Sequence, residues 1–342
     1  MKLRDLGEHQ LLSRIVQPLG RMPSNVSIGP GDDGAVFSVG ESPVVVSCDV
    51  LVEGQDFSFS WATWADVGWK AVAVNLSDLA AMGAEPVGIV IGLALSRDTR
   101  VEEVDEFYEG INACLACHGG VILGGDLSQT SGPMTVSITA IGKILSSGKP
   151  LKRYRGKTGD SIWVSGQLGA AALGWRLLEK ASMGAPGVRA AQESLPRELI
   201  DRQLRPVPRL ELGKLLSFAH FVGGAVDISD GIGTDIRHVV SPGCGADVFL
   251  SELPMSSLLD EFSAMAGTTK DSLALYGGED FEILAVLDPQ FENQLKLMVE
   301  KLGISWTRIG EVCGESEFTI VKGDGSRDVL EAGFEHFWNP TP

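Results

Sequence analysis

Strand-like and helix-like stretches alternate along the chain, and this alternation restricts the possible folds more than any other feature of the sequence. A run rich in β-branched residues at 42–52 is followed by a helical stretch rich in small residues at 63–83, which Gly83 ends. A second helical stretch follows at 99–118, and the spacing of leucine and isoleucine also predicts a helix at 4–19. Chains with this pattern form mixed α/β or α+β domains, in which helices pack on sheets.

The chain is long enough for about two domains, and a change of charge marks the expected boundary. With 342 residues, it exceeds the size that one hydrophobic core normally serves. Residues 146–160 are basic in an otherwise acidic chain, and a second series of strand-like and helix-like stretches begins after them. We therefore expect an N-terminal domain at 1–148 and a C-terminal α/β domain at 149–342.

The composition argues against several classes of protein. The net charge of −17 disfavours a nucleic-acid binder, since such proteins carry basic patches that neutralise phosphates. The first residues lack the apolar segment of a signal peptide, and no apolar run reaches the roughly 18 residues of a membrane span. The five cysteines are odd in number and scattered, as in a reducing compartment. We expect a cytoplasmic protein that binds neither nucleic acid nor membranes.

Acidic residues recur where predicted strands begin or end. The segment SIGPGDDGAVF places Asp32 and Asp33 side by side behind a glycine-proline turn, and YGGED places Glu279 and Asp280 before a strand. Asp78 lies within an apolar helix, where a carboxylate is costly unless it is paired, hydrogen-bonded or bound to a metal. Further acids at predicted strand ends are Asp49, Asp126, Asp227 and Asp230.

Two interpretations of these acids remain open. Each acid alone is typical of a turn or a helix cap, and Asp78 could form an ion pair with Lys70 or Arg97. Their recurrence favours a shared cation site, because converging carboxylates need cations, and Mg²⁺ is the first hard cation to consider for oxygen ligands. Bound cations would also let a polyphosphate approach an acidic protein.

Familiar catalytic motifs are absent from the sequence. It contains no Walker A loop, no protein-kinase catalytic or metal-binding motif, and no nucleophile elbow of the G-x-S-x-G type. Cys114, Cys117 and His118 have the spacing of half a zinc site, but no second pair matches them, so we expect the two cysteines to pack in the core. Nucleophilic hydrolase chemistry therefore has little support.

An ordered set of motifs spans nearly the whole chain, from roughly residue 5 to residue 338. The motifs are GPGDDGAVF, VVVSCDVLVEGQDF, KAVAVNLSDLAAMGAEP, ILGGDLSQT, LRPVPR, AVDISDGI and YGGEDFE. In this order they resemble those of the thiamine-monophosphate kinases, a family in the superfamily of aminoimidazole ribonucleotide synthetase and selenophosphate synthetase. The motifs are specific in combination.

The resemblance implies a fold, an assembly and a reaction. It implies a homodimer in which the N-terminal domains pair their strands into a shared β-barrel, each with a C-terminal α/β domain beside it. Residues 1–148 would then bind ATP and Mg²⁺ and form the dimer. The implied reaction is the ATP-dependent, Mg²⁺-assisted phosphorylation of thiamine monophosphate to thiamine diphosphate, by direct in-line transfer.

The resemblance also assigns roles to residues of this chain. The implied metal positions are Asp33, Ser47, Cys48, Asp49, Asp78, Asp126, Asp227 and Asp230. The implied nucleotide contacts are Tyr108, Gly125, Asp126, Arg153 and Ser229, and the implied thiamine contacts are Asp56, Glu279 and Phe334. Among them Asp33, Asp126 and Asp230 would be central to catalysis, and no residue would act as a covalent nucleophile.

Three of these positions depart from the family's usual pattern. Cys48 stands where threonine is common, and a backbone carbonyl could still serve a metal there. Asp56 replaces a usual histidine, and Phe334 replaces a frequent tyrosine. We therefore expect small differences in the substrate pocket.

Two other functions are weighed against the kinase. A sibling ATP-dependent synthetase of the same superfamily is one; a selenophosphate synthetase would carry a reactive cysteine near a glycine-rich N-terminus, which MKLRDLGEHQ lacks. A non-catalytic nucleotide-binding scaffold is the other, and the loss of several metal-binding acids would favour it. The acids are all present here, which favours catalysis.

Overall fold

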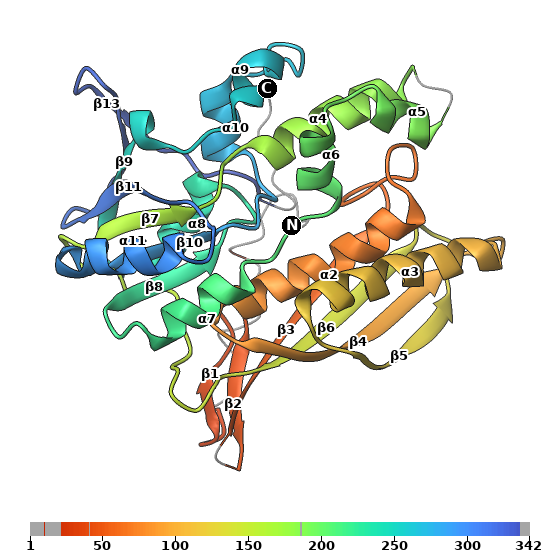
Figure 1. Cartoon of the computed structure of the whole chain (residues 1–342), viewed down its shortest axis with the longest axis horizontal. Coiled ribbons are helices and arrows are strands. Elements are labelled where there is room, and N and C mark those ends of the chain that lie inside the picture. Colours follow the sequence, from red (N-terminus) through yellow and green to blue (C-terminus); the bar gives the residue numbers. More distant parts are fainter. Residues whose placement is uncertain (1–9, 11–21, 41, 185–186, 336–342) are drawn as a thin grey trace.

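Two β-sheets, one from each half of the chain, form the framework of the protein (Figure 1). The computed structural model describes residue 10 and residues 22–40, 42–184 and 187–335. The helix predicted at 4–19 therefore lies outside the described residues, except for residue 10. The sequence predicted a mixed α/β fold, and the two sheets with their helices confirm it.

The first sheet has six strands and lies on the N-terminal side of the predicted boundary. Its strands are β1 (Val26–Ile28), β2 (Ala35–Val39), β3 (Ser42–Val52), β4 (Glu85–Leu95), β5 (Ile122–Gln129) and β6 (Thr135–Lys143). They lie in the order β1-β2-β3-β6-β4-β5. Neighbouring strands are antiparallel except β4 and β5, which run parallel because α3 connects them. The bounds of β3 are those of the predicted β-branched run at 42–52, but the prediction that a strand ends at Asp49 is wrong, since β3 continues to Val52.

Two long helices, α2 (Trp64–Ala81) and α3 (Val101–His118), pack on one face of this sheet (Figure 1). Thr63 and Asp66 form a capping box that fixes where α2 begins. The Thr63 hydroxyl accepts the Asp66 amide at 3.1 Å, and the Asp66 carboxylate accepts the Thr63 amide at 3.1 Å. None of the described helices combines the length and the apolar character that a membrane span needs.

Glycines let three helices approach until their backbones touch. A Cβ on Gly68 of α2 would lie 2.0 Å from a carbonyl oxygen of α3, and one on Gly110 of α3 would lie 1.9 Å from a carbonyl oxygen of α2. At the other end of α2, a Cβ on Gly213 of α7 (Leu210–Phe218) would lie 1.9 Å from another carbonyl oxygen of α2. Any side chain at these positions would push the helices apart, so α2 is held in one place along its axis.

The second sheet has seven strands, in the order β13-β12-β9-β11-β7-β10-β8. They are β7 (Ser161–Ser165), β8 (Val222–Asp227), β9 (Gly245–Phe249), β10 (Ile283–Leu287), β11 (Trp306–Cys313), β12 (Phe318–Val321) and β13 (Arg327–Val329). The other helices are α4 (Ala170–Ser182), α5 (Val188–Glu193), α6 (Arg197–Leu204), α8 (Ile232–Val239), α9 (Ser257–Phe262), α10 (Lys270–Tyr276) and α11 (Glu292–Glu300), with short 3₁₀ turns at Leu250–Glu252 and Pro289–Phe291.

The two halves share part of their core. Leu178 of α4 and two residues of α6, Ile200 and Leu204, are buried in the same cluster as the apolar residues of α2 and the first sheet. The α2 helix also packs against α7 and β8. As a result, α2 of the first half lies beside the end of β8 of the second half.

Candidate active site

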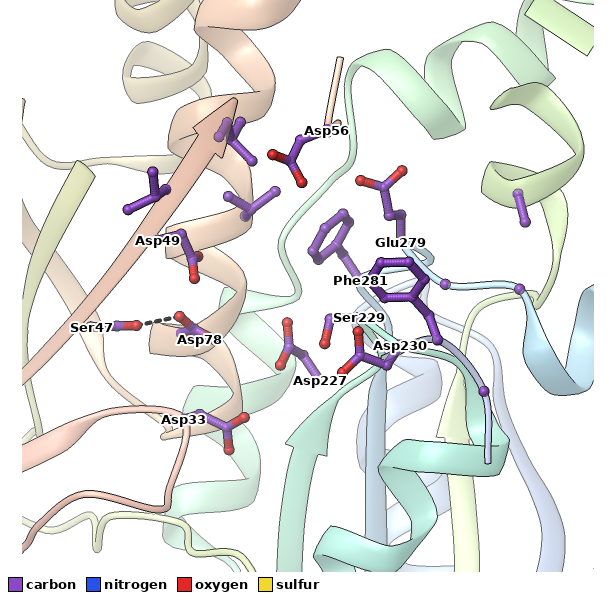
Figure 2. A pocket seen from close by; sticks show the side chains of 18 of the residues that line it. Asp33, Ser47, Asp49, Asp56, Asp78, Asp227, Ser229, Asp230, Glu279 and Phe281 are labelled. Atoms are coloured by element: carbon purple, nitrogen blue, oxygen red, sulfur yellow. Dashed lines mark hydrogen bonds between the residues drawn. The ribbon is translucent and has the colours of Figure 1, made fainter. Parts of the chain in front are cut away.

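A cavity of about 920 Å³ lies where the two halves meet. The walls come from β3, α2 and the loop before β2 on one side, and from the end of β8, the segment before β10, α4 and α10 on the other. Figure 2 shows acidic side chains that reach into it from both sides. The sequence-predicted residues that line it are Asp33, Ser47, Cys48, Asp49, Asp56, Asp78, Arg153, Asp227, Ser229, Asp230, Glu279 and Phe334.

Three carboxylates converge in this cavity. One oxygen from each of Asp33, Asp78 and Asp227 lies within 4.8 Å of the others. Asp33 comes from the loop between β1 and β2, Asp78 from α2, and Asp227 from the last position of β8. In the part of the chain that the structure describes, this is the one group of potential metal ligands so close together. Three motifs that are far apart in the sequence therefore meet in space.

Burial and nearby negative charges raise the pKa values of Asp49, Asp78 and Asp227. Burial, followed by the charge of Asp33, raises the pKa of Asp227 to about 8. Burial and the charges of Asp49 and Asp227 raise the pKa of Asp78 well above its usual value. Burial, followed by the charge of Asp33, also raises the pKa of Asp49 to about 6. A positive charge placed among these carboxylates would relieve the repulsion.

The chemistry of the cluster fits a hard cation. Asp33 Oδ1 accepts a hydrogen bond from Arg153 Nη2 at 2.6 Å, whereas its Oδ2 is buried without a partner among the described residues. Ser77 Oγ donates to Asp227 at 2.6 Å, which leaves the other oxygen of that carboxylate for a further contact. An all-oxygen donor set with an orphaned carboxylate oxygen suits Mg²⁺.

The strand β3 presents alternate residues to the cluster. Ser47 and Asp49 face α2, where Ser47 Oγ donates to Asp78 and the amide of Asp49 donates to Asn75 Oδ1 at 3.1 Å. Because side chains alternate along a strand, that of Cys48 points to the opposite, exposed face of the sheet. The Cys48 thiol instead lies 3.5 Å from Ser137 Oγ of β6.

The adjacent acids Asp32 and Asp33 have different surroundings. The Asp32 carboxylate accepts the backbone amides of Arg153 at 3.2 Å and of Asp33 at 3.1 Å, so it holds the loop. Burial, followed by the charge of Asp33, raises the pKa of Asp32 to about 6. Asp33 instead joins the acidic cluster, with the Arg153 guanidinium against one of its oxygens.

Two further acids lie at the other end of the cavity, away from Asp33. Figure 2 shows Asp56 and Glu279 there, one from each half of the chain. Asp56 Oδ2 accepts a backbone amide of β3 at 2.7 Å, and Glu279 Oε1 lies 2.6 Å from Lys70 Nζ. Phe334 also lines the cavity, and it is 52% exposed. The cavity thus has an acidic cluster, a separate acidic pair and an accessible aromatic ring.

Three sequence-predicted residues lie outside this cavity. Tyr108 on α3 is half-buried and packs edge-to-face on Phe107, with ring centroids 5.6 Å apart. Gly125 and Asp126 lie on β5, whose residues are exposed along its whole length. The sequence predicted that a strand ends at Asp126, but β5 continues to Gln129. Within one chain, these three residues do not meet the acidic cluster.

Sequence reasoning missed the groups that hold the acids in place. The sequence offered Lys70 and Arg97 as partners for Asp78, and both pairings are wrong. Lys70 pairs with Glu279, and Arg97 lies 3.8 Å from the neighbouring Asp98. The available signal was a lysine inside an apolar helix, since a buried ammonium group requires a countercharge.

The predicted packing of the paired cysteines is confirmed for one of them only. Cys114 is buried in the first core cluster. Cys117 is exposed, although it lies only about 60° around α3 from Cys114.

Comparisons with known proteins place the chain in a family. A family model described as AIR synthase related protein, N-terminal domain, matches residues 31–144. Thiamine-monophosphate kinase from Haemophilus influenzae is 34% identical, over 97% of this chain and 98% of the relative. The enzyme of the same name from Salmonella typhimurium is 33% identical, over 98% and 99%.

Solved structures show the same relationship. The structure described as "AaThiL complexed with AMPPCP and TMP" is 29% identical, with a TM-score of 0.82 over 98% of this chain and 99% of that one. The hydrogenase maturation protein HypE from E. coli, 17% identical with a TM-score of 0.64 over 84% and 85%, shares the fold alone. Because the identity to the two curated kinases extends over nearly the full length of both chains, this chain belongs to the thiamine-monophosphate kinase family.

Proposed function

We propose that this protein transfers the γ-phosphoryl group of ATP to the phosphate of thiamine monophosphate, which yields thiamine diphosphate. The observation that carries the proposal is the convergence of Asp33, Asp78 and Asp227 in a cavity large enough for two substrates, in a chain of this family. The solved relative that holds AMPPCP, an analogue of ATP, together with TMP supports the same pair of substrates.

In this proposal, Mg²⁺ occupies the acidic cluster. When bound, it would offset the negative charge of the phosphates. Its ligands within one chain would be Asp33, Ser47, Asp49, Asp78, Asp227 and Asp230, with Cys48 contributing at most its backbone carbonyl. Because the donors are oxygens held on separate elements, the site forms only when both halves of the chain are in place.

The chain's own groups then orient the two phosphates. The phosphate of thiamine monophosphate is ionised at neutral pH, so it attacks without a general base. The Arg153 guanidinium lies in the cavity and pairs with Asp33 at 2.6 Å, a position from which it can contact a phosphate oxygen. Ser229 lines the same wall and can donate a hydrogen bond to the nucleotide. Catalysis rests on positioning and charge, which is consistent with direct in-line transfer.

The test is a turnover assay with purified protein. ATP, Mg²⁺ and thiamine monophosphate are incubated with the protein, and thiamine diphosphate is measured by chromatography. We expect product that depends on all three components and disappears with EDTA. ATP consumption without thiamine diphosphate would favour a sibling synthetase, and tight ATP binding without consumption would favour a scaffold.

We further propose a homodimer formed by the N-terminal part of the chain, residues 1–148. The edge strand β5 is exposed along its length, and Leu127 on it is 68% exposed. Val50 and Val90, 52% and 37% exposed, alternate with buried residues along β3 and β4, so they lie on the face of the sheet opposite the core. An open edge and apolar residues of this kind are expected where strands of a second copy continue the sheet into a barrel.

The dimer would explain the three residues that lie outside the cavity. Tyr108, Gly125 and Asp126 would complete the nucleotide site of the second copy. Mixing the inactive variants Asp33→Asn and Asp126→Asn tests this, because in a shared site each mixed dimer contains one intact site. Random exchange should then restore about a quarter of parental activity. No recovery in a verified mixed dimer would contradict the shared site.

A further inference from the structure

Lys70 is a buried cation that joins the two halves of the chain beside the cavity. It lies on α2, and its side chain is only 2% exposed. Its Nζ lies 2.6 Å from Glu279 Oε1 and donates to the backbone oxygen of Asp56 at 3.2 Å. Since Asp56 and Glu279 both line the cavity, one buried ammonium group touches two parts of its wall.

Glu279 is held from two sides and still faces the cavity. Lys70 occupies Oε1, and Gln203 Nε2 donates to Oε2 at 2.6 Å. The side chain of Glu279 remains 33% exposed. An ionised carboxylate can accept about four hydrogen bonds, so these two contacts leave about half of its capacity for a ligand.

The backbone of this segment is fixed in an unusual conformation. Glu279 and Phe281 have φ angles of 66° and 48°, in the left-handed region that non-glycine residues rarely adopt. Both amides are anchored, since Glu279 donates to the carbonyl of Ser229 at 2.8 Å and Phe281 donates to that of Ile228 at 2.9 Å. Strain of this kind persists where surrounding contacts enforce it, and it is concentrated at functional sites.

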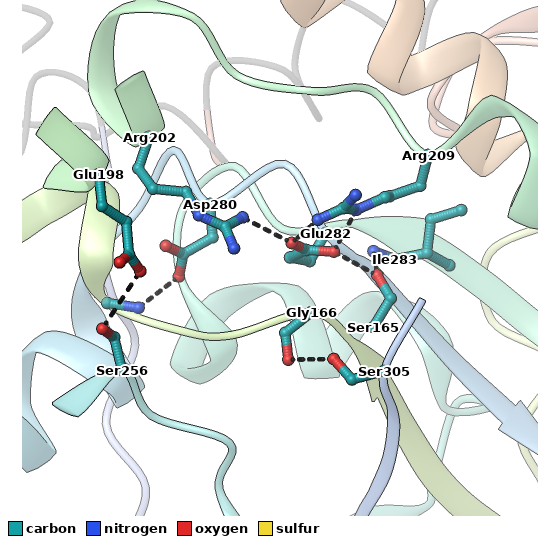
Figure 3. Close-up of polar contacts among 11 residues, drawn as sticks. Ser165, Gly166, Glu198, Arg202, Arg209, Ser256, Asp280, Glu282, Ile283 and Ser305 are labelled. Atoms are coloured by element: carbon teal, nitrogen blue, oxygen red, sulfur yellow. Dashed lines mark hydrogen bonds and ion pairs between the residues drawn. The ribbon is translucent and has the colours of Figure 1, made fainter. Parts of the chain in front are cut away.

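Buried polar contacts below the segment enforce this conformation (Figure 3). Glu282 is buried and accepts from Arg202 at 3.0 Å, from Arg209 at 2.5 and 2.7 Å, and from Ser165 at 2.6 Å. Asp280 Oδ2 accepts the amide of Gly169 at 2.8 Å. Asp280 and Glu282 are thus bound on the side away from the cavity, while Glu279 and Phe281 line it.

The helix α6 contacts this segment twice. Its neighbouring residues Arg202 and Gln203 reach Glu282 and Glu279, respectively. The second half of the chain therefore fixes the backbone and one carboxylate oxygen of Glu279. The other oxygen is fixed from the first half, by Lys70 alone among the described residues.

We propose that Lys70 is a positioning residue for substrate recognition: with Gln203, it holds the Glu279 carboxylate as the acceptor for the amino-bearing heterocycle of thiamine monophosphate. The proposal rests on the proposed function. A carboxylate held at both oxygens binds a donor without losing side-chain freedom on binding, and this lowers the cost of recognition. Lys70 itself does not line the cavity, so it acts through Glu279.

The test is a double-mutant cycle of Lys70→Met, Glu279→Gln and the combined variant. We expect Lys70→Met to raise KM for thiamine monophosphate by about tenfold or more, with KM for ATP changed by less than about twofold. If Lys70 acts through Glu279, the combined variant should have the KM of Glu279→Gln alone. The control is Lys214→Met, because Lys214 also pairs with a glutamate, Glu85 at 2.7 Å, but lies outside the cavity.

Several results would overturn the proposal. One is an unchanged KM for thiamine monophosphate in Lys70→Met, and another is an equal rise in KM for ATP in that variant. A third is a combined variant in which the rises in KM of the two single variants multiply. If Lys70→Met does not fold, Gln203→Met provides the second arm, and an unchanged KM for thiamine monophosphate there contradicts the proposal. If the parent protein makes no thiamine diphosphate, the proposed function fails separately. Calorimetric binding of thiamine monophosphate to the same variants then decides the role of Lys70.

Discussion

Replacing Asp227 with asparagine should stabilise the metal-free protein at high pH. Burial and the charge of Asp33 raise the pKa of Asp227 from 3.8 to about 8, so the folded state binds this proton more tightly than the unfolded state. The resulting stability is complete below pH 3.8, falls as the pH rises, and is lost once the pH passes about 8. Above that pH, the parent protein carries an ionised, buried carboxylate among other acids, and the variant does not.

The structure sets the size of this effect. A shift from 3.8 to about 8 corresponds to at most about 6 kcal/mol, at about 1.4 kcal/mol for each pKa unit. Asparagine keeps an acceptor for Ser77 Oγ but buries two N–H donors, which costs about 1–3 kcal/mol if they lack partners. We therefore expect Asp227→Asn to be more stable than the parent by about 3 kcal/mol at pH 9, with little or no gain near pH 5.

The assay is urea unfolding in EDTA at pH 5, 7 and 9, with and without excess Mg²⁺. Mg²⁺ should stabilise the parent more than the variant, because a ligand stabilises only the state that binds it. Asp98→Asn is the control, since Asp98 is 86% exposed and lies outside the cavity. A stability difference between parent and Asp227→Asn that is independent of pH, or a variant less stable than the parent at pH 9 in EDTA, would refute the reasoning.

Three further predictions concern turnover, substrate binding and the path of the phosphoryl group. Asp33→Asn removes one charge of the cluster and the ionic partner of Arg153, so turnover should fall by about 10²-fold or more, or about 2.7 kcal/mol of transition-state stabilisation; near-parental activity contradicts this. Phe334→Ala removes an exposed ring from the cavity wall and should raise KM for thiamine monophosphate more than KM for ATP, so steady-state kinetics with equal changes would place the ring elsewhere. Incubation with γ-labelled ATP alone should leave the denatured protein unlabelled, whereas stable label on an aspartate would show a phosphoenzyme.

Local patterns in the sequence predicted most of the regular elements. The helix at 63–83 is recognisable because Thr63 and Asp66 have the spacing of a capping box and Gly83 follows the last turn. The bounds of β3 agree because its β-branched run is uninterrupted. The predicted end of β5 was wrong. Aspartate is a poor strand former, so Asp126 indicated an end, but pairing with β4 continues the strand to Gln129.

Sequence patterns did not predict the contacts between distant segments. The partner of Lys70 lies in the other half of the chain, and nothing within a turn of α2 indicates it. The order of the motifs placed Asp33, Asp78 and Asp227 in one family site, but their distances follow from how three elements pack. The resemblance also gave Ser47, Cys48 and Asp49 the same role, although side chains alternate along β3. Cys48 therefore faces away from Ser47 and Asp49.

The fixed position of α2 has a consequence for which molecules fit the cavity. Lys70 and Asp78 are eight residues apart on this helix, so a rise of about 12 Å separates the contact to Glu279 from the acidic cluster. Because the glycine contacts prevent α2 from sliding, this spacing would set the distance between heterocycle and phosphate in a bound substrate, if Glu279 binds the heterocycle and the cluster holds the phosphate as proposed. Inserting one residue between Lys70 and Asp78 would lengthen the spacing by about 1.5 Å and rotate the carboxylate by about 100°. Under these proposals, the number of residues in a helix would set the length of substrate that fits, rather than the shape of a loop.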